Sequence, residues 1–215
     1  MAPTKLMIIR HAEKPGIYGG QDYKGVDLKG DVAGDQGVKQ LITIGWQRAG
    51  ALIALFAPPW GPKPPLETPG FLFASNPIHG SGTPQDDGPS QRPYETLLPL
   101  ATKLGLPIDV DYRKDDYDMM IAAALTKSGP VLIAWQHEDI PMLNKAKGPG
   151  ISQSILTRTN TTASASLGVP NHWPKDGNGV SRYDLVWVFD LSPGDGTVQN
   201  FTLVPQRLLA GDTGL

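Results

Sequence analysis

Near its start the chain reads LMIIRH over residues 6–11. Four consecutive apolar residues of this kind are typical of a strand that is buried on both faces, as in a parallel sheet covered by helices. The apolar run stops at Arg10 and His11, so both side chains are expected where the strand leaves the sheet. Two later runs have the same character, FLFA over residues 71–74 and VLIAW over residues 131–135.

Helical patterns lie between these runs. Apolar side chains recur near helical spacing over residues 38–56, and residues 93–104 predict a second helix that ends at Gly105. A third helix is expected after Asp115 or Asp116. Strands that alternate with helices predict an α/β fold, which we expect to be a three-layer α/β/α sandwich around a mostly parallel sheet.

The rest of the chain predicts a hairpin and two long loops. Residues 183–191 and 198–204 are β-rich and flank a Pro-Gly-Asp-Gly turn, which predicts a closing hairpin. A short helix with Pro141 in its first turn is expected after the third strand. Loop composition predicts an insertion at about 76–91 and a long loop at about 148–180.

Composition bounds the class of protein. The length of 215 residues predicts a single domain over residues 1–215. Lys plus Arg number 19 and Asp plus Glu number 21, so the net charge is −2, and neither a nucleic-acid partner nor a membrane-binding surface is expected. The absence of cysteine excludes disulfides, thiolate metal sites and a thiol nucleophile. No secretory signal precedes the first strand, so a cytoplasmic protein is expected.

Three strand exits are the places where a ligand is expected, because open parallel sheets bind ligands beyond the carboxyl ends of their strands. These exits are residues 10–11, 75–76 and 136–137. Arg10 offers a guanidinium fork for phosphate. The His11 imidazole can attack phosphorus when its other ring nitrogen is held by a backbone carbonyl.

Two further positions add to this chemistry. Arg92 precedes Pro93 at a helix start, and a helix N-terminus favours anions. His137 is followed by two acids, Glu138 and Asp139, which places an imidazole beside a proton donor. Taken singly, these residues also fit a polar loop, a surface arginine paired with a carboxylate, and a histidine that caps a helix. Together they are far more specific.

Four segments that carry these residues resemble the histidine phosphatase superfamily, which includes phosphoglycerate mutase-like and acid phosphatase-like branches. The segments are RHAEKP at 10–15, ASNP at 74–77, RPYET at 92–96 and VLIAWQH at 131–137. The resemblance covers residues 5–143. It implies a phosphoglycerate mutase-like fold and a metal-independent phosphatase that uses no cofactor.

The same resemblance implies a role for each site residue. His11 would attack phosphorus and become phosphohistidine, while Arg10, Arg92 and His137 would bind the phosphate oxygens. In the acid phosphatase-like branch the proton donor directly follows the second histidine, which favours Glu138. The alternatives for the proton donor are Asp139, Asp115, Asp116 and Glu95.

Some features depart from the family pattern or lie at its edge. Residues 78–91 separate the second motif from Arg92, which predicts an inserted lip over the site. Lys14, Tyr18 and His79 are candidates for a substrate rim, although each also fits an ordinary surface position.

The expected substrate is a small phosphorylated molecule or a phosphoprotein. Two other functions stay open, a phosphoglycerate mutase-type phosphotransferase and a phospho-ligand binding protein without turnover. The residues after His11 read AEKP, where the mutases tend to have Gly-Glu-Ser, which disfavours the first. The presence of both histidines, both arginines and a candidate acid disfavours the second.

Overall fold

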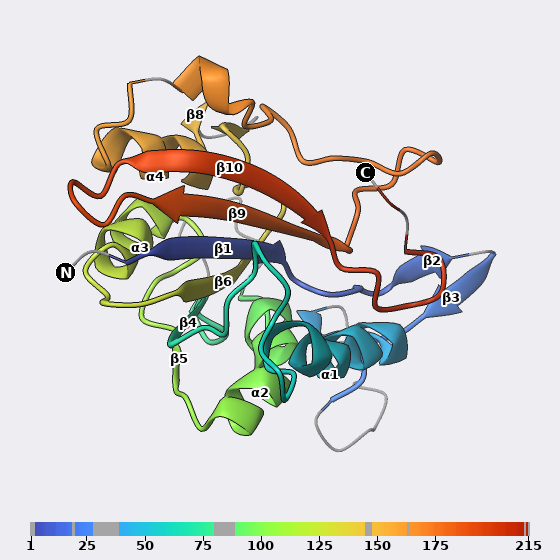
Figure 1. Ribbon diagram of the computed structural model, residues 1–215. Coiled ribbons are helices and arrows are strands. Elements are labelled where there is room, and N and C mark those ends of the chain that lie inside the picture. The colour runs from blue at the N-terminus through green and yellow to red at the C-terminus, as the bar shows by residue number, and fades with distance from the viewer. Residues whose placement is uncertain are drawn as a thin grey trace.

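The computed structural model describes residues 3–18, 20–27, 39–79, 89–144, 148–162, 164–212 and 214. Its main strands are β1 (Lys5–Arg10), β4 (Phe71–Ala74), β5 (Ile108–Asp109), β6 (Val131–Trp135), β9 (Leu185–Leu191) and β10 (Val198–Pro205). They form one six-stranded sheet in the order β10-β9-β1-β6-β4-β5 (Figure 1). Strands β1, β6, β4 and β5 pair in parallel, whereas β9 is antiparallel to β1 and β10. The prediction of an α/β fold with a mostly parallel central sheet is confirmed.

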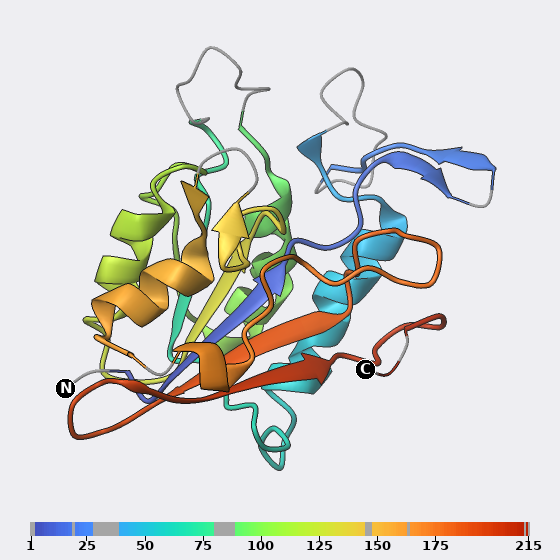
Figure 2. The ribbon, with the colours of Figure 1, turned by 90° about the horizontal axis from the view of Figure 1, so that it is seen from above.

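The described ranges contain four α-helices, which cover this sheet: α1 (Thr43–Phe56), α2 (Arg92–Leu104), α3 (Tyr117–Ala124) and α4 (Ile151–Arg158). The side chains of β1 alternate between the two faces, because successive strand residues point to opposite sides. Met7 and Ile9 pack in a cluster with α1 and α2, whereas Leu6 and Ile8 pack in a cluster with α3 and α4. Figures 1 and 2 agree that α1 and α2 lie on one side of the sheet and α3 and α4 on the other. Burial on both faces explains the continuous apolar run of β1.

The predicted strands at 6–9, 71–74 and 131–135 and the predicted helix at 93–104 match observed elements with small shifts at their ends. The hairpin is present, since β9 and β10 pair in antiparallel register. Helix α2 ends at Gly105, whose φ of 66° suits a residue without a side chain. Helix α1 begins later than expected, at Thr43. The amides of Leu41 and Ile42 instead donate to the Glu95 carboxylate and the Glu13 carbonyl, so tertiary contacts take the place of a first helical turn.

Two local predictions are wrong. The range 148–180 is predicted to be a loop, but it contains α4, whose buried residues are Ile151, Ser152, Ser154, Ile155 and Leu156. The expected short helix at Pro141 is replaced by turns and by β7 (Leu143–Asn144), which pairs with β8 (Gly148–Pro149). The carbonyls of Asp139 and Ile140 accept the amides of Ile151 and Ser152, so they are not available for a helix at Pro141. A Cβ on Gly150 would lie 2.0 Å from the Pro141 carbonyl oxygen, which shows how closely the two segments pack.

The predicted insertion at 76–91 falls largely on residues 80–88, which lie outside the described residues. Its described ends are held together by the Gln91 side chain, which donates to the Pro77 carbonyl at 2.7 Å. A small hairpin, β2 (Gly16–Tyr18) and β3 (Gln21–Tyr23), follows the exit of β1. Within the described ranges, no helix combines the length and apolar character that crossing a bilayer requires.

A buried ion cluster joins the segment after β1 to α1 and to the carboxyl-terminal segment. The Arg48 guanidinium donates to Glu13 Oε1 at 2.7 and 2.9 Å and to both Asp212 carboxylate oxygens at 2.8 and 3.0 Å. The three side chains are 5–10% exposed. Burial raises the pKa of Asp212, but its hydrogen bonds to Arg48 outweigh burial and the net pKa is lowered. The cluster therefore fixes the chain two residues beyond His11.

Replacing this arginine is expected to destabilise the protein strongly. Arg48→Ala leaves two buried carboxylates without their cation, which should cost about 3–5 kcal/mol in the free energy of unfolding at pH 7. The matched control is Arg158→Ala, because the Arg158–Asp118 pair is exposed and should contribute about 0–1 kcal/mol. Chemical denaturation measures both.

At lower pH the Glu13 and Asp212 carboxylates become protonated in Arg48→Ala, which removes the uncompensated charges. The difference in the free energy of unfolding between Arg48→Ala and the wild type should therefore become smaller. A loss for Arg48→Ala no larger than that for Arg158→Ala would contradict the structural role of the cluster.

Candidate active site

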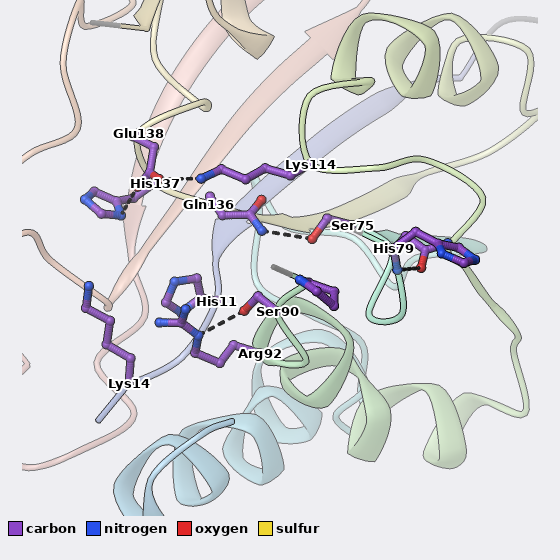
Figure 3. A pocket seen from close by; sticks show the side chains of 12 residues that line it. His11, Lys14, Ser75, His79, Ser90, Arg92, Lys114, Gln136, His137 and Glu138 are labelled. Carbon is purple, nitrogen blue, oxygen red and sulfur yellow. Dashed lines mark hydrogen bonds and ion pairs between the residues drawn. The ribbon is translucent and has the colours of Figure 1, made fainter. Parts of the chain in front are cut away.

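The candidate active site lies where three parallel strands end at the same edge. Arg10 pairs with Trp135 across β1 and β6, and Ala74 pairs with Ala134 across β4 and β6. The residues that follow these strands therefore emerge together. They line a cavity of about 100 Å³, drawn in Figure 3. Its lining residues are His11, Lys14, Ser75, Asn76, His79, Pro89, Ser90, Arg92, Lys114, Gln136, His137 and Glu138.

His11 is held in one orientation at this edge. Its backbone amide donates to the Trp135 carbonyl at 3.0 Å, and its Nδ1 lies 2.7 Å from the Ala12 carbonyl oxygen. A carbonyl only accepts, so Nδ1 carries the hydrogen and Nε2 keeps its lone pair. Burial, with the charges of Arg92 and Arg10, lowers the pKa of His11 well below its usual range. The imidazole is therefore neutral at neutral pH and has a free nucleophilic nitrogen.

The start of α2 supports both His11 and a cation. Thr96 Oγ1 accepts the Ala12 amide at 2.9 Å and donates to the Arg92 carbonyl at 2.7 Å. Arg92 Nε donates to Ser90 Oγ at 3.0 Å, and Figure 3 shows this side chain beside His11. Thr96 thus ties the segment that follows His11 to the helix that carries Arg92. The sequence motif RPYET contains this threonine, although its bonding could be seen only in the structure.

His137 and Glu138 form the opposite side of the cavity. His137 Nδ1 lies 3.2 Å from Glu138 Oε2, and Lys114 Nζ donates to Glu138 Oε1 at 2.9 Å. Burial and the charge of Arg10 lower the pKa of His137 to about 4. Burial raises the pKa of Glu138, but Lys114 and His137 outweigh burial, so the net pKa is lowered. In the free site at neutral pH, His137 is neutral and Glu138 is ionised.

The Arg10 side chain lies outside the cavity, whereas the sequence predicts that it binds phosphate there. Its guanidinium carbon lies 3.6 Å from the ring centroid of Tyr183, and Nη1 donates to the Ser181 carbonyl. Arg10 is not among the residues that line the cavity, although its charge acts on both histidines. The structure brings together His11, Arg92, His137 and Glu138, and it places the Arg10 side chain behind them against the segment 181–183.

Among the candidate proton donors, only Glu138 lines the cavity within the described part of the chain. Asp139 is fully buried and accepts a hydrogen bond from Asn144, and burial raises its pKa to about 7. Glu95 is also buried with a pKa raised to about 7, and it accepts the Leu41 amide at 2.8 Å. Asp115 lines a separate hollow on the surface beside α3 and α4.

The three candidate rim residues separate into two groups. Lys14 and His79 line the cavity. Tyr18 donates to the Lys14 carbonyl at 2.8 Å and lines a neighbouring hollow instead. Sequence reasoning missed Lys114, because no local pattern around it indicates a site. Among the described residues, no group of three His, Asp or Glu side chains is placed to hold a metal ion.

Comparisons with known proteins give loose structural likenesses and no match by sequence. No protein-family model matches the sequence, and no curated protein matches it. Among solved structures, the chain is similar to a protein from Agrobacterium tumefaciens provisionally named phosphohistidine phosphatase SixA. The identity is 14%, the TM-score is 0.40, and the match covers 94% of this chain and 96% of that one. At this score the likeness supports no functional argument, so the function proposed below rests on the chain's own residues.

Anion binding at this site is expected to take up a proton. Tungstate is a dianion with the shape of phosphate, and beside His137 it would favour the imidazolium over the neutral ring. Because the pKa of the empty site's His137 is about 4, binding at pH 7 must add the proton. Affinity should therefore fall as the pH rises from 7 to 9, by at most about tenfold per pH unit.

Calorimetry in buffers of different ionisation enthalpy measures both the affinity and the proton uptake. His137→Gln should lose the part of the slope that belongs to the imidazole, and His172→Gln, which changes a histidine outside the cavity, should keep the full slope. A wild-type affinity that does not change with pH would contradict this assignment, as would a full slope in His137→Gln.

Proposed function

We propose that this chain is a metal-independent phosphatase of the histidine phosphatase type, which hydrolyses phosphomonoesters through a phosphohistidine on His11. The observation that carries the proposal is the neutral His11 imidazole, whose Nδ1 is held by the Ala12 carbonyl at 2.7 Å in a cavity shared with Arg92 and His137. The proposal includes a phosphoglycerate mutase-like α/β/α sandwich that forms one domain around this site. The substrate would be a small phosphorylated molecule or a phosphoprotein.

The first half of the reaction forms the phosphoenzyme. His11 Nε2 attacks phosphorus while the bond from phosphorus to the leaving oxygen breaks. Glu138, protonated in the substrate complex, gives its proton to that oxygen, and the alcohol leaves. The dianionic substrate raises the pKa of this carboxyl group, and so opposes the effect that Lys114 has in the empty site. Arg92 and His137 bind the oxygens that remain on phosphorus and stabilise their charge.

The second half regenerates the enzyme. A water attacks phosphorus opposite His11, and the Glu138 carboxylate takes a proton from that water. The bond between phosphorus and Nε2 breaks, inorganic phosphate leaves, and both His11 and Glu138 return to their starting states. Arg10 would assist from behind the two histidines, or reach the phosphate if its guanidinium leaves Tyr183.

Hydrolysis fits the site better than transfer to a second substrate. A mutase must protect its phosphohistidine from water. The Glu138 side chain is 47% exposed at the edge of the cavity, so water reaches the position from which the phosphoenzyme would be attacked. The site therefore favours a phosphatase over a phosphoglycerate mutase-type transferase.

Loss of the nucleophile is expected to abolish turnover. The wild type should hydrolyse p-nitrophenyl phosphate in the presence of EDTA and should form an acid-labile phosphoenzyme on rapid quenching. His11→Ala should lower kcat by at least about 10³-fold, because removal of a nucleophile costs most of the catalysis. His79→Ala, a second histidine of the same cavity, should stay within about tenfold of the wild type. Near-normal activity in His11→Ala would overturn the proposal.

The role of Glu138 is tested by the leaving group. Glu138→Gln should lose about 10²-fold in kcat on an alkyl phosphate, whose leaving oxygen needs a proton. The loss should be much smaller on p-nitrophenyl phosphate, whose leaving group needs little protonation. The matched control is Glu67→Gln, because Glu67 also pairs with a lysine and is likewise 47% exposed. Equal losses on both substrates would assign the proton to another group, such as Asp139.

A further inference from the structure

A larger hollow opens directly beside the candidate active site. Its volume is about 540 Å³, and it shares His137 and Glu138 with the catalytic cavity. Its other walls include Pro141, Leu143 and Trp173. We call it the side hollow. Its position means that a molecule bound at His137 and Glu138 can extend into it without leaving the protein surface.

The catalytic cavity is too small to hold a whole substrate. Its volume is about 100 Å³, whereas pockets for small organic ligands usually measure about 300–1,000 Å³. The cavity suits the phosphoryl group, and the rest of the substrate needs another place. In the proposed reaction Glu138 must touch the oxygen that joins phosphorus to the organic group. The organic group therefore begins beside Glu138, at the junction with the side hollow.

Three of the eight described residues that line the side hollow are apolar, namely Pro141, Leu143 and Trp173, and Trp173 is fixed in place. The Trp173 ring stacks on Trp187 with centroids 5.3 Å apart and planes 6° apart, and its Nε1 donates to the Arg182 carbonyl at 2.7 Å. Its single polar atom is thus satisfied away from any ligand. Leu143 is 50% exposed, although an apolar side chain of this size is more stable when covered. An apolar ligand would cover it.

The charged residues of the side hollow also disfavour a cationic ligand. Lys175 lines it, and Glu138 is the only carboxylate among its lining residues in the described part of the chain. A cationic organic group is therefore disfavoured near Lys175. An uncharged or anionic apolar group meets no such penalty.

A second neighbouring hollow, of about 610 Å³, fits this role less well. It shares no lining residue with the catalytic cavity, and Ile17, Tyr18 and Tyr183 are among its walls. Four carboxylates and two arginines line it, and three of the carboxylates pair with Arg48 or Arg182. Its charge therefore decides nothing between the two hollows, whereas the side hollow alone shares lining residues with the catalytic cavity.

We propose that the side hollow binds the organic group of the substrate, and that the substrate class is a phosphomonoester of an apolar, ring-sized alcohol or phenol. This inference rests on the proposed phosphatase function. It assigns Leu143 to substrate specificity, through contact with the leaving group and without a part in the chemistry.

The test compares 2-phenylethyl phosphate with ethyl phosphate. Both leaving groups are primary alkoxides of similar basicity, so the chemical step is alike and only the size of the apolar group differs. The wild type should prefer 2-phenylethyl phosphate by at least about tenfold in kcat/KM, the usual value of a few buried methylene groups. Leu143→Ser should reduce that preference by about fivefold and leave kcat/KM for ethyl phosphate unchanged.

Ile17→Ser is the matched control, since Ile17 is 76% exposed and lines the second hollow. It should keep the wild-type preference. Equal kcat/KM for the two esters would overturn the inference while leaving the phosphatase proposal intact. A loss of preference in Ile17→Ser, and none in Leu143→Ser, would overturn it in favour of the second hollow.

Binding of the two corresponding phosphonates separates this inference from the proposed function, because phosphonates bind without turnover. The 2-phenylethyl phosphonate should bind at least about tenfold more tightly than the ethyl phosphonate, and Leu143→Ser should remove most of the difference. If neither ester is hydrolysed but the phosphonates show this pattern, the proposed function fails and the side hollow stands. If the two phosphonates bind equally, the inference that the side hollow binds the organic group is overturned, whether or not the esters are hydrolysed.

Discussion

The parallel pairing of β1 with β6 is the constraint on which the site depends. Arg10 lies opposite Trp135, so His11 and the segment 136–138 leave the sheet at the same level. A slip of one residue would exchange the two faces of β1 and bury its side chains in the wrong clusters. Both faces of β1 are fully buried, which fixes the register and with it the position of His11 relative to His137.

The second organising feature is how the chain distributes charge. Although its net charge is −2, the cavity of the candidate active site gathers Lys14, Arg92 and Lys114 around Glu138, whose carboxylate is the only one that lines it in the described part of the chain. Burial keeps both histidines neutral beside these cations. A phosphate dianion would relieve the repulsion among the cations. By contrast, the buried Arg48 is neutralised by Glu13 and Asp212, so its charge serves the fold.

Sequence reasoning succeeded where a signal is local and failed where it depends on distant packing. Apolar runs located the three central strands, and the residues at their ends gave His11 and His137. The α4 helix was missed because its buried residues include Ser152 and Ser154, so they form no clear apolar pattern at helical spacing. Lys114 reaches the cavity from a loop. Its carbonyl accepts a hydrogen bond from the Trp135 indole at 3.1 Å, which is a contact between distant segments. The direction of Arg10 depends on Tyr183, far along the chain.

The central claim is that His11 Nε2 faces a tetrahedral anion held by Arg92 and His137. A crystal structure with tungstate bound tests it most directly. The account predicts tungsten in line with His11 Nε2, with oxygens in contact with Arg92 and His137 and with one oxygen facing Glu138. Tungstate bound at another place, or His11 with its ring turned so that Nε2 no longer faces the anion, would contradict it.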